Sequence, residues 1–239
     1  MRSDGRMDDE MRPIQLKRDY TRYAEGSVHV QAGNTRVLCT AMVQDGVPHH
    51  CRNQHIGWVT AEYAMLPSSN ADRRSLHRSP SGRTREIQRL IGRSLRLAVD
   101  LSQFQGRTIW CDCDVIQADG GTRTASVTGA FVALTDALWK MKERGDIEVL
   151  PIKEGISAIS VGIVEGRPLL DLTGEEDKAA DVDMNVIMTH SGEFVEIQGT
   201  GEETPFGRES LDDLLTLATK GNEEIRQKQM GLLTERLAI

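Results

Sequence analysis

Apolar and polar residues alternate over several short stretches of the chain, and this two-residue period is typical of half-buried β-strands. Residues 26–32 and 35–44 are two such stretches, and Gly33-Asn34 between them has the composition of a tight hairpin turn. The same pattern predicts strands at 56–66 and 108–116. Further along the chain it predicts four shorter strands, at 156–164, 168–172, 181–189 and 193–198.

Three other segments have the period of an amphipathic helix. Residues 84–101 place apolar side chains at helical spacing, while arginines occupy the other side of this segment. A second helix is predicted at 125–144 and a final one at 210–237, where Ser210 and Asp213 form a capping pattern. Residues 67–82 contain almost no apolar side chain, which is typical of a loop.

The order of these elements mixes β-hairpins with two crossover helices, which predicts an α/β two-layer fold rather than a helix bundle or a β-sandwich. No internal repeat or linker divides the chain, so a single domain over residues 1–239 is expected. No apolar run approaches the roughly 20 residues that a membrane span requires. The charged N-terminus lacks the apolar core of a secretory signal, and we therefore expect a cytoplasmic protein.

The distribution of charge along the chain is more informative than the net charge of -7. Residues 73–96 contain eight arginines and one acid, whereas residues 171–213 contain thirteen acids and only two basic residues. This asymmetry predicts a concentrated cationic surface for phosphate groups on an otherwise acidic protein. The four cysteines match neither a zinc site nor a disulfide framework, and we expect reduced, structural thiols.

Two segments could bind an anion. Residues 120–124 read Gly-Gly-Thr-Arg-Thr between a predicted strand and a predicted helix, an order in which glycines let backbone amides approach a phosphate. A plain glycine turn with a threonine cap explains the same residues. Arg83 lies where a helix begins, and its charge is unfavourable there unless an anion is bound, although a solvated loop arginine is an equal alternative.

An acidic cluster follows in the second half of the chain. Asp181 and Asp183 share one face of a predicted strand, and Asp177, in the preceding loop, could fold back toward them. Carboxylates grouped in this way suit Mg²⁺, which uses one or two of them and also bridges to substrate phosphates. A solvated acidic loop is the alternative interpretation.

Together these segments resemble the ribonuclease PH family over nearly the whole chain. The carrying motifs are DGR at residue 4, EGSV at 25, GNTRV at 33, GWVTAEYAMLP at 57, GRTREIQRLIGRSLR at 82, DCDVIQADGGTRTASVTGA at 112, AISVGI at 158, LLDLTGEED at 169, VDMNVIMT at 182 and EIQGTGE at 196. The resemblance implies a ribosomal-protein-like βαβα fold and a homo-oligomeric, hexameric ring. It also implies a phosphorolytic 3′-to-5′ exoribonuclease, in which inorganic phosphate releases nucleoside 5′-diphosphates from the 3′ ends of tRNA precursors.

Matching motif to motif, the resemblance also assigns site residues. Its phosphate-binding positions fall on Arg83, Gly121, Thr122 and Arg123. Its two functional aspartates, which would also hold Mg²⁺, fall on Asp177 and Asp183, whereas Asp181 has no counterpart. Because phosphate is its own nucleophile, no serine or cysteine triad is needed, and positioning and charge neutralisation should dominate catalysis.

RNA binding is predicted for a separate group of arginines. Arg73, Arg74 and Arg78 lie in the polar loop and should contact the phosphate backbone rather than the bases, although this loop looks shorter than usual for the family. Two alternatives are a non-catalytic RNA-binding subunit of an exosome-like ring and a small-molecule kinase of similar fold. An inactive subunit has no chemical need for the five charged or hydroxyl site residues, which are Arg83, Thr122, Arg123, Asp177 and Asp183. The lack of a nucleotide-binding glycine loop argues against the kinase.

Overall fold

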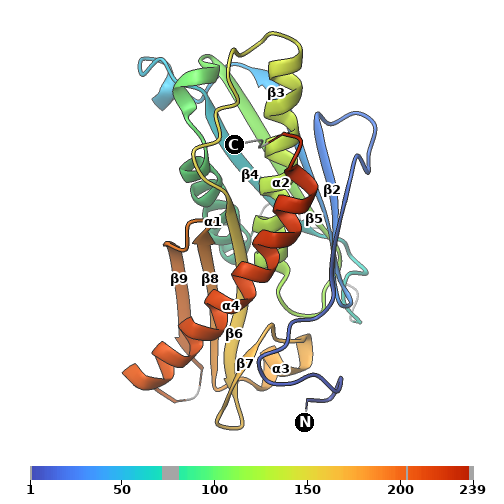
Figure 1. The fold of residues 1–239 in the computed structure, drawn as a ribbon, viewed down its shortest axis with the longest axis vertical. Helices are drawn as coiled ribbons and strands as arrows, with labels where there is room; N and C mark the ends of the chain where they lie inside the picture. Colours follow the sequence, from blue (N-terminus) through green and yellow to red (C-terminus); the bar gives the residue numbers. More distant parts are fainter. Residues whose placement is uncertain (1, 72–80, 203, 237–239) are drawn as a thin grey trace.

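The computed structural model describes residues 2–71, 81–202 and 204–236, and these residues form two β-sheets flanked by α-helices (Figure 1). The first sheet has the order β1-β2-β3-β5-β4. Its neighbours are antiparallel except for β4 and β5, which run parallel, so the sheet is mixed. The five strands are β1 (Ile14–Arg18), β2 (Gly26–Ala32), β3 (Thr35–Asp45), β4 (Trp58–Met65) and β5 (Arg107–Gln117).

The second sheet is antiparallel and has the order β7-β6-β8-β9. Its strands are β6 (Ile156–Val164), β7 (Arg167–Leu170), β8 (Val182–Thr189) and β9 (Phe194–Gly201). The helices of the described residues are α1 (Gly82–Ala98), α2 (Thr122–Glu143), the short α3 (Gly174–Ala179) and α4 (Arg208–Leu233).

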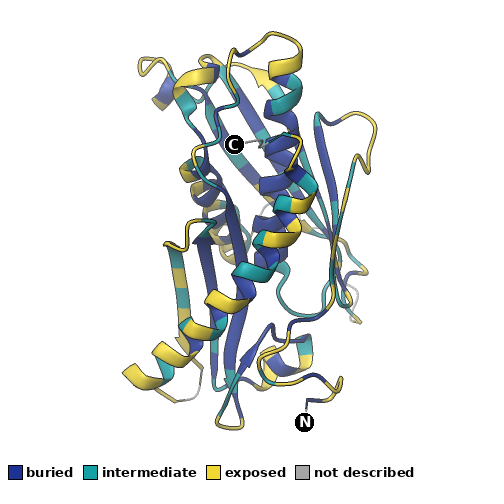
Figure 2. Ribbon diagram, in the orientation of Figure 1, coloured by how far each residue is buried: buried dark blue, intermediate teal, exposed yellow. Residues whose placement is uncertain are grey.

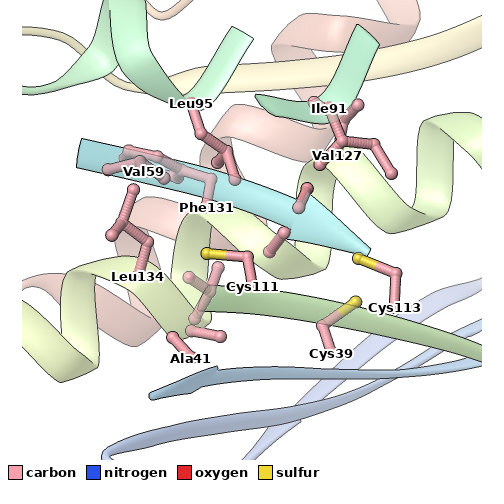
Figure 3. Close-up of a cluster of buried hydrophobic side chains, with 14 of the residues drawn as sticks. Cys39, Ala41, Val59, Ile91, Leu95, Cys111, Cys113, Val127, Phe131 and Leu134 are labelled. Atoms are coloured by element: carbon pink, nitrogen blue, oxygen red, sulfur yellow. The ribbon is translucent and has the colours of Figure 1, made fainter. Parts of the chain in front are cut away.

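Helix α2 is the central element of the fold, because it contacts strands of both sheets. Its residues from Thr124 to Leu138 are all buried, and Figure 2 shows the buried segments gathered around it. The main core contains side chains from α1, α2, β3, β4 and β5 (Figure 3). A second cluster lies between α4 and the second sheet. Packing against both sheets therefore fixes helix α2, and with it the position of its N-terminus.

Most predicted elements are confirmed, and so is the α/β fold class. β2 and β6 have the predicted bounds, and Gly33, with φ of 55°, makes the predicted hairpin turn. The sequence interpretation did not include β1, a short edge strand, or α3, which occupies a segment taken as loop. Among the described residues, no helix is long and apolar enough to cross a membrane. All four cysteines are buried and free, as predicted.

All three predicted helix starts are wrong by two or three residues, and α1 covers Gly82–Ala98 rather than residues 84–101. Helix α2 begins at Thr122 rather than at Ala125, because Gly121 takes the left-handed conformation at its N-cap. Helix α4 begins at Arg208, and its N-cap is Gly207 rather than Ser210. Phe206 and Leu211 stand at the two positions of a hydrophobic staple on either side of this start, and both pack against the second core.

Candidate active site

The glycine turn before α2 has a conformation that requires glycine. Gly120 and Gly121 have φ angles of 75° and 65°, a region that disfavours other residues. A Cβ atom on Gly120 would lie 2.2 Å from the carbonyl oxygen of Leu172, so the turn also packs tightly against the segment that leads into α3. Within the described chain no side chain caps α2, and its first N–H groups are available for an anion.

Thr122 and Arg123 are the first two residues of helix α2, and a buried tyrosine contacts this end of the helix. The hydroxyl of Tyr63, on β4, donates to Oγ1 of Thr122 at 2.9 Å. Burial raises the pKa of Tyr63, and the nearby charges of Arg83 and Arg123 partly offset that increase. Arg83 is the second residue of α1, whose N-cap Ser81 accepts from the N–H of Thr84. The first turns of two helices thus bring two arginines toward one hydroxyl pair.

The acidic residues of the site come from the second sheet and α3. Burial raises the pKa of Asp183, on β8, to about 6, and the charges of Asp177 and Glu202 raise it as well. Arg123 and Arg83 act in the opposite direction on the same carboxyl. The two arginines and the three acids are therefore close enough to interact, although their sequence positions span more than a hundred residues.

The structure brings together all the residues predicted to bind phosphate or metal. The prediction that Asp177 lies in a loop is wrong, because it lies in the first turn of α3, where a capping box between Thr173 and Glu176 favours helix. The backbone of Asp181 accepts a hydrogen bond from the N–H of Glu202 and so ties β8 to the end of β9. The predicted RNA-binding residues Arg73, Arg74 and Arg78 lie outside the described residues.

Sequence reasoning missed two contributors to this site. Tyr63 alternates with other buried residues of its strand, and it lies in the main core. That alternation carries no sign that its hydroxyl reaches Thr122. Glu202 lies in the EIQGTGE motif, but its proximity to Asp183 depends on the pairing of β8 with β9.

The described residues of the site include charged groups that can stabilise charge, but they do not include a complete set of protein ligands for a metal ion. Among the described residues, no group of three or more histidine, cysteine, aspartate or glutamate side chains has metal-binding geometry. Two carboxylates, Asp177 and Asp183, could still hold an ion that takes its other ligands from water and substrate. The helix terminus and arginines would bind an anion beside them.

Two family models match the chain. Residues 10–139 match "3' exoribonuclease family, domain 1" and residues 156–221 match "3' exoribonuclease family, domain 2". Among curated relatives named ribonuclease PH, that of Corynebacterium efficiens is 55% identical over 235 residues, covering 97% of this chain and 96% of the relative. That of Bacillus velezensis is 55% identical over 241 residues, covering 99% and 98%.

Solved structures show the same fold. Rice (Oryza sativa) Rrp46 superimposes with a TM-score of 0.79 at 18% identity, covering 97% of this chain and all 100% of that one. A chain of the Archaeoglobus fulgidus exosome, solved with RNA bound to the active site, gives 0.79 at 24% identity, covering 95% and 92%. At this identity the likeness concerns the fold alone.

The family models define the class of protein: the chain belongs to the 3′ exoribonuclease family, which consists of RNA-degrading enzymes. Within that family, its near-full-length relatives are ribonucleases PH, which confirms the predicted resemblance and the predicted phosphate-dependent exoribonuclease activity. The alternative of a non-catalytic ring subunit is not favoured by these relatives.

Proposed function

We propose that this site removes 3′-terminal nucleotides from tRNA precursors by phosphorolysis, with Asp177 and Asp183 holding a Mg²⁺ ion beside the bound phosphate. The observation that carries the proposal is the meeting of two opposite sets of charges at one place, the arginines of α1 and α2 and the acids of α3 and β8. Phosphorolysis needs both, because phosphate and RNA are anions and the departing oxygen develops negative charge.

Phosphate binding falls to the N-terminus of α2. The N–H groups of its first turn, the hydroxyl of Thr122 and the guanidinium of Arg123 surround the glycine turn, and Arg83 adds a second cation from α1. Tyr63 donates to Oγ1 of Thr122, which leaves the Thr122 proton free to donate to a phosphate oxygen. The chain thereby orients the nucleophile, which phosphate itself supplies.

The acids fit a hard divalent cation. Burial raises the pKa of Asp183 to about 6, and repulsion from Asp177 adds to this increase, so a cation beside the two carboxylates would be favourable. Mg²⁺ keeps several waters and takes one or two carboxylates, which is what Asp177 and Asp183 offer. Bound there, it would neutralise charge on the scissile phosphate. Asp183 would bind the ion as a carboxylate, because metal binding requires the ionised form.

RNA binding would fall to Arg73, Arg74 and Arg78, which stand between β4 and α1 in the sequence and would contact the RNA backbone. We further propose a hexameric ring in the cytoplasm, since related folds occur in exosome cores, and a ring would gather several basic loops around one RNA.

The test is single-turnover degradation of a 3′-labelled tRNA precursor with and without inorganic phosphate. We expect nucleoside diphosphates that depend on added phosphate, and a loss of about 10²-fold or more in Asp177→Asn and Asp183→Asn. Mn²⁺ binding, measured by electron paramagnetic resonance, should weaken in both variants, whereas Asp181→Asn serves as a control. Monophosphate products, or unaltered metal binding in both variants, would contradict the proposal.

A further inference from the structure

The N-terminal arm, defined here as residues 2–12, is attached to the protein by buried charges. Arg2, Arg6 and Arg12 are only 4%, 8% and 5% exposed, and Met11 is the arm's one buried apolar residue. Burying a guanidinium is costly unless it is paired and fully hydrogen-bonded. Covering the surface alone does not require three buried arginines. The residues that pair with these arginines therefore indicate the role of the arm.

Two of these arginines hold the segment that connects β7 to α3. Arg2 forms a bidentate salt bridge with Glu176, in which Nε and Nη2 lie 2.7 and 2.6 Å from the two carboxylate oxygens. Arg12 donates three hydrogen bonds to the carboxylate of Asp171, at 2.9, 2.9 and 2.6 Å. Asp171 has a φ of 56°, a left-handed conformation that a non-glycine residue keeps only when its surroundings hold it.

The pair between Arg2 and Glu176 sets the direction of Asp177. Helix α3 has 6 residues, too few for a stable helix without tertiary support. Successive residues of a helix point about 100° apart. The contact of Glu176 with the arm therefore also fixes the direction of the Asp177 side chain. Asp177 is exposed on another side of α3, and its charge acts on Asp183.

Arg12 connects the same segment to the phosphate-binding turn. Its Nη1 donates to the carbonyl oxygen of Asp119, and a Cβ on Gly121 would lie 3.2 Å from its Nη2. The carboxylate of Asp119 in turn accepts from the N–H of Gly174, at the start of α3, at 3.0 Å. Arg12 therefore contacts both the glycine turn and the segment that leads into α3.

We propose that the N-terminal arm is a positioning element for catalysis, in which Arg2 orients Asp177 and Arg12 braces the phosphate-binding turn. The inference rests on the proposed function of Asp177. The arm's arginines are not free to bind substrate, because Arg2 and Arg12 pair with Glu176 and Asp171, and Arg6 pairs with Asp4. They act through the residues they hold.

The two arginines should have separable kinetic effects. In Arg2→Gln, we expect kcat to fall about 10-fold to 10²-fold, with the KM for phosphate within about twofold of wild type, because misplacing a catalytic group costs rate. In Arg12→Gln, the KM for phosphate should rise about 5-fold or more. Arg167→Gln is the matched control, since it removes a more exposed pair between the body and Asp8 of the arm and should leave both constants unchanged.

A double variant tests whether Arg2 acts through Asp177. Adding Arg2→Gln to Asp177→Asn should cause no further loss of kcat, because the group that Arg2 orients is already gone. Multiplicative losses would overturn the proposal, as would wild-type kcat in a folded Arg2→Gln. Should Arg2→Gln fail to fold, Glu176→Gln replaces it in the same cycle. If Asp177→Asn alone retains full kcat, the proposed function of Asp177 fails instead.

Discussion

Replacing Asp183 with asparagine should stabilise the protein while it removes activity. Burial and the charge of Asp177 raise the pKa of Asp183 from the ordinary 3.8 to about 6 in the folded protein. The folded state therefore binds this proton more tightly than the unfolded chain does. The contribution of Asp183 to stability is fully present below about pH 4 and is lost as the pH rises through about 6.

The size of the effect follows from the pKa difference. A difference of about two pH units, at about 1.4 kcal/mol for each unit, makes the ionised carboxylate unfavourable by on the order of 3 kcal/mol at neutral pH. Asparagine keeps the shape and cannot ionise. We therefore expect Asp183→Asn to raise the free energy of unfolding by about 2 to 3 kcal/mol at pH 7.5, and by much less at pH 4.5.

Urea unfolding in the presence of a chelator, at both pH values and at one protein concentration, measures this difference. Asp181→Asn is the control, since it removes a carboxylate two residues away, and we expect it to change the free energy of unfolding by no more than about 0.5 kcal/mol. An asparagine variant at position 183 that is no more stable than wild type at pH 7.5 would refute the reasoning. A gain of equal size at both pH values would refute it too, because the gain would then not come from ionisation.

Three further substitutions test other contacts. Tyr63→Phe removes the donor to Thr122 and should raise the KM for phosphate about 3-fold to 10-fold while kcat stays near wild type, measured by steady-state phosphorolysis; an unchanged KM would remove Tyr63 from the site. Gly120→Ala places a Cβ 2.2 Å from a backbone oxygen and should lower both phosphate affinity and the melting temperature, whereas Gly145→Ala, with nothing within 4 Å, controls for the loss of a left-handed glycine. Asp136→Asn leaves two arginines without a buried anion and should cost about 3 to 5 kcal/mol in urea unfolding, with little change in the KM for phosphate of the folded fraction.

The elements that could be predicted are those whose signal is local. β2 and β6 have the predicted bounds because their apolar alternation is uninterrupted, and Gly33 ends one of the strands as its conformational freedom suggests. Helix α3 could not be recognised in this way. Its 6 residues show no apolar period, and its stability comes from Thr173, Glu176 and an arginine 174 positions away.

The same distinction holds for the site. The motifs identified Arg83, Thr122 and Arg123 as phosphate-binding candidates, but the residues alone left a plain helix cap as an alternative. The structure adds the approach of Asp183 from the other sheet, which no local pattern contains. The DGR motif at residue 4 was part of the resemblance, but no site residue was assigned to it. Its Arg6 is buried against the backbone oxygen of Asp171.

The charges of the site are arranged against the stability of the folded protein. Arg83 and Arg123 each occupy the first turn of a helix that has no acid there, the end at which a cation is unfavourable. Asp177 and Glu202 crowd a carboxylate that burial already penalises. The arginines relieve Asp183 only in part, since its pKa stays well above 3.8. Neither set of charges is fully neutralised by the other. The arginines can still bind an anion, and the acids can still bind a cation or a proton. In the proposed function, a phosphate and a divalent cation would satisfy both at once, because charges that the protein does not pair internally can interact with a substrate and its transition state.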